Sequence, residues 1–178
     1  MSGKLTDAMW RWSGEGELPL VVDATSCTNG IVNDLPLALG EADRERHAEL
    51  EVIDSLTWGF ERLVPRLEVT RKLGPVAVHP TCSGRHLGLD RRLRALAGEL
   101  ADDPEVPPSA ACCGFAGDRG FLHPELTAAA TVEEAAEVRA GEFAAFVSSN
   151  RTCEIAMERA TGRPYVHVLQ LLEELTRP

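Results

Sequence analysis

The chain has 178 residues, and its 18 Lys and Arg against 28 Asp and Glu give a formal net charge of −10. This length favours one domain or slightly more, and 44% hydrophobic with 26% charged residues indicates a globular protein. The acidic charge argues against nucleic-acid binding, which needs clustered Lys and Arg. The sequence has no apolar run of roughly 20 residues and no signal-peptide core, so we expect a cytoplasmic protein that meets the inner membrane only through partners.

Short apolar runs alternate with amphipathic segments along the chain. Residues 1–17 hold two tryptophans without a clear period, and we expect a short helix or an arm there. The strand candidates are residues 18–23, 75–79 and 143–148, with 165–168 as a weaker fourth. Most of these runs are continuously apolar rather than alternating, which is typical of strands buried on both faces of a parallel sheet.

Helical patterns lie between the predicted strands. Leucines and other apolar residues recur at spacings of three and four over 50–63 and 89–100. Further helices are expected over 124–140, from about Arg151 (capped by Ser149 or Asn150) to Gly162, and over 168–175. Segments 33–48 and 101–108 are predicted breaks. Strands alternating with helices predict an α/β fold with a mainly parallel sheet flanked by helices.

The five cysteines are the most informative residues. Their odd number and the adjacent pair argue against a disulfide framework and favour metal binding or redox chemistry, although a free cysteine is also a common small core residue. Three of them follow predicted strands, and the pair ends the connection after helix 89–100. Loops after parallel strands meet at one edge of a sheet. We therefore predict a shared site at that edge, on loops that carry Cys27, Cys82, Cys112, Cys113 and Cys153.

Two further features flank these cysteines. Gly114 and Gly117 follow the pair, and such glycines let backbone N–H groups approach a ligand or simply make a tight turn. His79 and His86 flank Cys82, where a histidine is either a ligand or, more often, a structural residue at a strand end. Thiol–disulfide chemistry at Cys112-Cys113 is a third interpretation, although a vicinal disulfide is strained.

The cysteine order, with the flanking stretches 22–27, 112–121 and 148–154, resembles the cysteine-rich CCG domain. That domain recurs in the cysteine-rich subunit of heterodisulfide reductase, in the iron–sulfur subunit of glycolate oxidase and at the C-terminus of FAD-linked D-lactate dehydrogenases. The sequences of these three stretches are most similar to those of the last group. The resemblance implies that Cys82, Cys112, Cys113 and Cys153 are metal ligands. Asn150 stands where the family's closing Cys-x-x-Cys has its first cysteine, and it joins Gly114 and Gly117 as a predicted cofactor-binding residue.

The resemblance also implies a division of the chain. Residues 71–178 are expected to form the CCG domain, and 18–70 to be the remnant of a preceding repeat packed on it. Cys27 matches the last cysteine of that repeat, with Ala24 in place of its partner. We expect the chain to be the C-terminal part of a larger oxidoreductase and to self-associate through the apolar surface of residues 18–39.

The function implied by the resemblance is electron transfer through a [4Fe–4S] cluster in an FAD-linked D-2-hydroxyacid dehydrogenase of the D-lactate or glycolate type. FAD would belong to a missing domain or a partner subunit, and the electron acceptor would be a quinone or a cytochrome. The isolated chain is then expected to be inactive as a dehydrogenase. The alternative is a zinc-binding structural or assembly module, because four thiolates suffice for one zinc ion.

Overall fold

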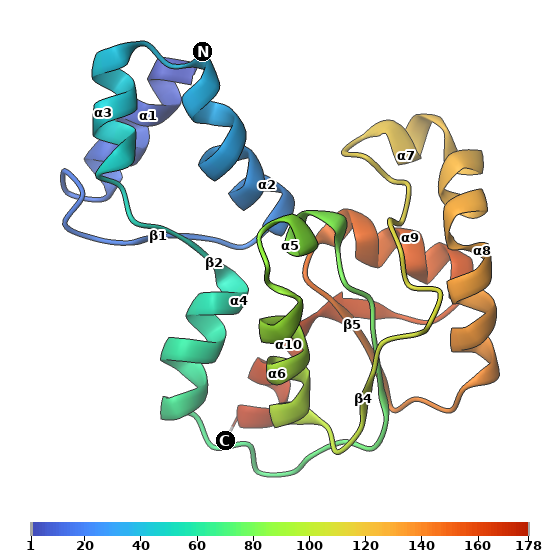
Figure 1. Cartoon of the computed structure of the whole chain (residues 1–178). Helices are drawn as coiled ribbons and strands as arrows, with labels where there is room; N and C mark the ends of the chain where they lie inside the picture. Colours follow the sequence, from blue (N-terminus) through green and yellow to red (C-terminus); the bar gives the residue numbers. More distant parts are fainter. Residues whose placement is uncertain (1, 178) are drawn as a thin grey trace.

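Two parallel sheets organise the protein, which a computed structural model describes over residues 2–177 (Figure 1). The larger sheet has the strand order β4-β3-β5-β6, and the smaller one pairs β1 with β2. Every pairing between these strands is parallel. The strands are β1 (Leu20–Val22), β2 (Val52–Asp54), β3 (Val76–Val78), β4 (Pro104–Glu105), β5 (Ala145–Ser148) and β6 (Tyr165–His167).

The order of the larger sheet creates a switch point between β3 and β5. After β3 the chain crosses to β4 on one side, and it later returns to β5 on the other side. Val78 lies opposite Val147, and the N–H of His79 extends this pairing by donating to the Val147 carbonyl at 2.9 Å. The segments after β3 and β5 diverge from this point, and such a divergence leaves a crevice at the C-terminal edge of a sheet.

Helices cover both faces of the larger sheet and also form an N-terminal group (Figure 1). In the part of the chain that the structure describes, no helix is both long and apolar enough to cross a membrane. The helices are α1 (Ser2–Trp12), α2 (Thr25–Asn29), α3 (Glu41–Ala48), α4 (Ser55–Trp58), α5 (Cys82–His86), α6 (Asp90–Leu100), α7 (Arg119–Leu122), α8 (Pro124–Ala140), α9 (Arg151–Thr161) and α10 (Val168–Thr176). Irregular helical turns continue α2 as η1 (Gly30–Asp34) and η2 (Leu35–Ala38), and continue α4 as η3 (Gly59–Leu63) and η4 (Val64–Arg66).

The short strand β3 is buried from both sides. Its Val76 and Val78 side chains join a cluster that includes Leu96 of α6 and residues of α4 and α10. Ala77 points the other way and joins a cluster with Met157 of α9 and residues of α8. This alternation is the period of two that a strand imposes, and it explains why every position of the run is apolar.

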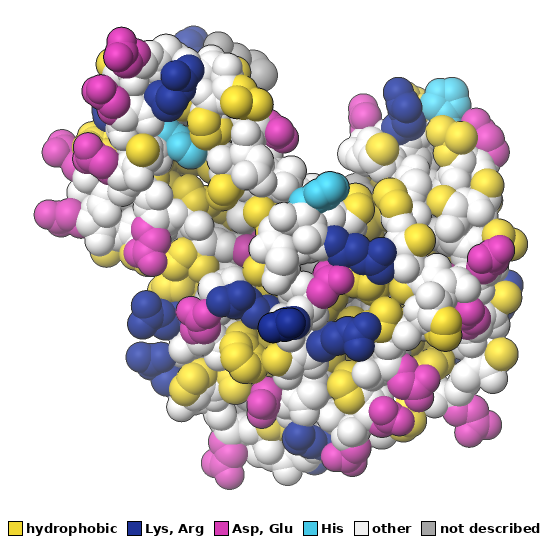
Figure 2. All heavy atoms as spheres, viewed as in Figure 1, with side chains coloured by type: hydrophobic (Ala, Val, Ile, Leu, Met, Phe, Trp, Pro, Cys, Tyr) yellow, Lys and Arg dark blue, Asp and Glu magenta, His cyan; other side chains and the backbone are white. Residues whose placement is uncertain are grey.

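The N-terminal group consists of α1 to α4 and the smaller sheet. It lies beside the larger sheet and meets that part of the protein through α2 and α4 (Figure 1). Within this group α1 and α3 are joined by an ion pair between Asp7 and Arg46, at 2.8 Å. Figure 2 shows that the surface is hollowed between this group and the α7–α8 arm. Helix α5, which begins at Cys82, lies at the base of the hollow in Figure 1.

Most elements lie where the hydrophobic periodicity placed them. The α/β class, the four strand candidates and the helices over 89–100, 124–140, 151–162 and 168–175 are confirmed. The break over 33–48 is wrong after Gly40, because residues 41–48 form α3 with acidic residues in its first turn and basic ones in its last. The single helix over 50–63 is also wrong, because Val52–Asp54 form β2 before α4 begins. The short β4 lies in the predicted break over 101–108.

Candidate metal centre

The predicted site residues come together at the C-terminal edge of the larger sheet. Cys82 starts α5 just after β3, and Cys153 lies in the first turn of α9 just after β5. Cys113 belongs to the connection between β4 and α7. Cys153 therefore lies at the start of the predicted helix, whereas Cys82 and Cys27 lie in short helices, α5 and α2, rather than on loops.

An inner group of three buried ligand atoms forms the centre of the site. One ligand atom each of His79, Cys113 and Cys153 lies within 4.8 Å of the other two. The Sγ atoms of Cys113 and Cys153 are 3.1 Å apart, and both residues are 4% exposed. These two cysteines pack with Phe115 and Ala156 in a small apolar cluster. The pairing of Cys113 with Cys153 brings together two residues of the predicted ligand set.

His79 is held in this group by its backbone and by its ring. It follows β3 directly, and its carbonyl accepts a hydrogen bond from the Ser148 hydroxyl at 2.9 Å. Its ring Nδ1 lies 2.7 Å from Oε1 of Glu134, a buried residue of α8. Its other nitrogen, Nε2, is buried without a hydrogen-bond partner. Sequence reasoning had favoured a structural role for His79 over a ligand role, because nothing in the local pattern reveals a contact with a helix 55 positions away.

The charges of the inner group favour a thiolate at Cys113. The hydrogen bond with Cys153 lowers the pKa of Cys113 to about 5 despite its desolvation, and His79 lowers this pKa further. Burial alone would lower the pKa of His79, but its contacts with Cys113 and Glu134 raise it to about 9. The neighbouring Cys113 and burial raise the pKa of Cys153 above its ordinary value. These shifts favour a thiolate at Cys113 over one at Cys153.

Cys82 and Cys112 form an outer pair beside the inner group. Both are exposed. Burial of part of the Cys82 side chain raises the pKa of its thiol, and the neighbouring Cys112 and Cys113 raise it further. The structure therefore brings all four predicted cysteines to one place, although only Cys113 and Cys153 belong to the compact group. The role of each as a ligand remains a prediction.

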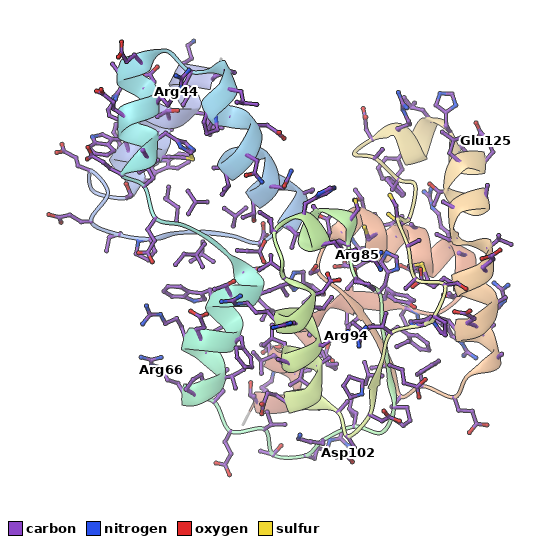
Figure 3. The ribbon with its side chains drawn as sticks, in the orientation of Figure 1. Arg44, Arg66, Arg85, Arg94, Asp102 and Glu125 are labelled. Carbon is purple, nitrogen blue, oxygen red and sulfur yellow. The ribbon has the colours of Figure 1, made fainter. Side chains whose placement is uncertain are left out.

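The loop that carries the cysteine pair is fixed by backbone geometry. Gly114 and Gly117 both have φ of +69°, a left-handed conformation that favours glycine. A Cβ atom at Gly114 would lie 2.8 Å from the Cβ of Ala130 on α8. Arg85 of α5, labelled in Figure 3, also holds the loop by donating to the carbonyl of Ala110 at 2.8 Å. The glycines are thus needed by the turn itself, whether or not their N–H groups contact a cofactor.

The position that lacks a cysteine, Asn150, contacts Ser26, Thr152 and Cys153. Its Nδ2 is 4.0 Å from Sγ of Cys153, and its Oδ1 accepts a hydrogen bond from Ser26 at 3.2 Å. Ser26 lies in α2 next to the exposed Cys27. The N-terminal segment therefore reaches the edge of the site at the position where the family motif has its additional thiol. Cys27 does not belong to the compact His79, Cys113 and Cys153 group.

The donor set fits a metal that prefers sulfur and nitrogen. Two thiolates bound tetrahedrally at Zn–S distances of about 2.3 Å lie about 3.8 Å apart. The Cys113 and Cys153 sulfurs are slightly closer than this. The unpartnered Nε2 of His79 is a third donor, and the outer Cys82 and Cys112 lie beside the group. Cys113 is only 4% exposed, and this burial favours a role as a metal ligand over a role as a nucleophile.

A comparison with protein families supports this interpretation. The model of the CCG family, described as a cysteine-rich domain, matches residues 76–158. The matched segment runs from the start of β3 into α9, covers just under half of the chain, and includes His79 and the four cysteines. No curated protein matches the chain. Residues 76–158 are therefore similar to a CCG cysteine-rich domain, as the cysteine motif had indicated.

Proposed function

We propose that the chain is an electron-transfer module whose CCG-like segment holds a [4Fe–4S] cluster through Cys82, Cys112, Cys113 and Cys153. The observation that carries this proposal is the meeting of four thiols from three distant segments at the switch point of the sheet. An iron–sulfur cluster held by thiolates accepts and releases single electrons when bound. The family match over 76–158 supports the proposal independently.

The protein residues around the thiols have identifiable roles in such a centre. Cys113 and Cys153 would bind from the buried side, where Phe115 and Ala156 exclude water. Cys82 and Cys112 are both exposed and would bind from that side. Cys82 begins α5, which lies at the base of the hollow between the N-terminal group and the α7–α8 arm (Figures 1 and 2). A redox partner that approached through this hollow would come closest to the outer pair. The shortest path for an electron between the cluster and such a partner would therefore run through the exposed side of the site.

Anaerobic reconstitution with iron and sulfide tests this proposal. The reconstituted protein should be brown and should contain iron and labile sulfide in stoichiometric amounts. Cys113→Ser should lose most of the iron, whereas Cys27→Ser should retain it, because Cys27 is not one of the four proposed ligands. Iron content near zero in the wild-type protein would contradict the proposal.

A second candidate is a structural zinc site, and two observations favour it. The pair His79 Nδ1–Glu134 Oε1 is the arrangement in which zinc-binding histidines are commonly held. The three inner atoms also suit a single ion, whereas a cubane cluster places each thiolate on a different iron. Metal analysis by mass spectrometry on freshly purified protein distinguishes the two, since a zinc site yields about one zinc per chain and no labile sulfide.

We further propose a place for the module in a larger system. By its resemblance to FAD-linked D-lactate dehydrogenases and glycolate oxidase proteins, the chain would receive electrons from a flavin domain or subunit that oxidises a D-2-hydroxyacid. It would deliver them to a quinone or a cytochrome. Mixing the reconstituted module with a reduced flavoprotein of this class should bleach the cluster absorbance. Failure of every such donor to reduce a loaded cluster would count against this assignment.

A further inference from the structure

The ring of His79 is held by one nitrogen and free at the other. A carboxylate can only accept hydrogen bonds, so the 2.7 Å contact with Glu134 places the ring hydrogen on Nδ1. This leaves Nε2, which is buried and has no hydrogen-bond partner, as the atom available to a metal. Because Nδ1 is occupied, Nε2 is the ring atom that can complete the compact group with the two sulfurs.

Glu134 explains this orientation. Its side chain is 3% exposed and reaches the site from the middle of α8. A buried carboxylate is unfavourable unless it is paired and hydrogen-bonded. Its neighbour Glu133 is exposed, as is Glu125 in the first turn of the helix. The buried position of Glu134 is thus accounted for by its bond to His79, whose backbone is in turn fixed at the end of β3.

We propose that Glu134 is a positioning residue that presents Nε2 of His79 as a third ligand beside Cys113 and Cys153, so that the centre has mixed imidazole and thiolate ligands. The inference rests on the proposed metal-binding function, but it differs from the all-cysteine ligand set of the family motif. A carboxylate behind a ligand histidine fixes its tautomer and increases its basicity. In an iron–sulfur centre, histidine in place of cysteine raises the reduction potential.

Cobalt(II) titration of the reduced, metal-free chain tests the inference, because cobalt reports its ligands by absorbance. The variants are His79→Ala and Glu134→Gln. Glu133→Gln is the matched control, since it makes the same change at the adjacent exposed position of α8. The near-ultraviolet sulfur-to-cobalt band reports the thiolates, and the visible d–d bands report the whole ligand set.

The expected result separates the roles of the residues. His79→Ala should shift the d–d bands while the sulfur-to-cobalt band persists. Glu134→Gln should weaken cobalt binding by about 10- to 100-fold, the usual effect of removing a group that orients a ligand. Glu133→Gln should match the wild type. Wild-type spectra and affinity in both His79→Ala and Glu134→Gln would overturn the inference but leave the proposed function intact. A wild-type chain that binds neither cobalt, zinc nor iron would overturn both.

A measurement on the unaltered protein guards against variants that fail to fold. Nitrogen-15 NMR of the histidine rings should show that Nε2 of His79 changes its chemical shift on zinc binding while Nδ1 keeps its hydrogen. His86, on the exposed side of α5, serves as the internal control and should not respond. An unchanged His79 ring in zinc-loaded protein would overturn the inference.

Discussion

The side-chain oxygens of Thr25 and Thr81 lie 3.0 Å apart in the interior, although 56 positions separate them. Thr25 also lies 3.1 Å from the hydroxyl of Ser83. Thr81 caps α5 by accepting a hydrogen bond from the N–H of Gly84 at 3.0 Å. The first residue of α2 is thus joined to the start of the helix that carries Cys82. This hydroxyl cluster connects the N-terminal segment with the metal-site edge of the larger sheet.

Thr25→Val should destabilise the protein by about 1–3 kcal/mol, because it keeps the side-chain shape but leaves buried hydroxyls with fewer partners. Denaturant unfolding monitored by tryptophan fluorescence measures the loss. Ser26→Ala, which removes one hydrogen bond at a more exposed position, should cost less than about 1 kcal/mol. Equal losses of unfolding free energy in the two variants would show that the buried hydroxyl cluster stabilises the protein no more than the single hydrogen bond of Ser26.

Gly114 and Gly117 offer a matched pair of substitutions. Both have φ of +69°, so alanine at either position adopts a strained backbone at a cost of about 1–2 kcal/mol. Only at Gly114 would the new Cβ also meet Ala130, at 2.8 Å, since no atom lies within 4 Å at Gly117. Gly114→Ala should therefore destabilise the protein more than Gly117→Ala and should also weaken metal binding. The opposite order in thermal unfolding would contradict this geometry.

The metal-free protein should contain a thiolate at neutral pH. The pKa of Cys113 is lowered to about 5, so this sulfur should be ionised at pH 7 and become protonated as the pH falls through about 5. A lowered pKa contributes stability that is complete above the unfolded value of about 8.5 and is lost as the pH falls through about 5. Ultraviolet thiolate absorbance over this range measures the titration. Cys113→Ser should remove the step, and its persistence in that variant would assign it elsewhere.

We also expect the chain to self-associate through the N-terminal segment. Leu18 is 60% exposed, Val21 44% and Leu37 81%, which is unusual for large apolar side chains in one short segment. Light scattering after size-exclusion chromatography should give a mass above that of the monomer. Leu37→Asp should reduce this mass, whereas Leu122→Asp, at a 72% exposed position of α7, should not. A wild-type monomer at high concentration would contradict the prediction.

The sequence identified elements whose pattern is regular and local. Continuous apolar runs predicted β3 and β5, and Pro124 with an Ala- and Glu-rich run predicted α8 with the bounds that the structure has. The sequence missed β2, because Ile53 fits the helical spacing of the residues after it, although pairing with β1 makes it a strand. It also missed α3, since this helix has no apolar face. Tertiary pairing and surface charge decided these cases.

The sequence predicted that the cysteines of the site lie close together, but it did not predict the histidine beside them. Cysteines that follow buried strands must meet at one edge of a parallel sheet, and the order of motifs placed Cys113 and Cys153 there. His79 gave no such signal, because its role depends on Glu134 of α8. In the sequence, Glu134 is one of two adjacent glutamates, and no period separates it from the exposed Glu133. Only the packing of α8 against the sheet shows which of them is buried.

The switch point between β3 and β5 also has a consequence for biogenesis. The donors of the inner group come from three stretches that adjoin only after the crossover to β4 and the return to β5 are complete. A nascent or unfolded chain therefore has no local nest in which a metal can nucleate structure, unlike a zinc finger with its closely spaced ligands. The metal must therefore be inserted late in maturation. Once bound, it will cross-link the segments after the central strands and oppose their separation.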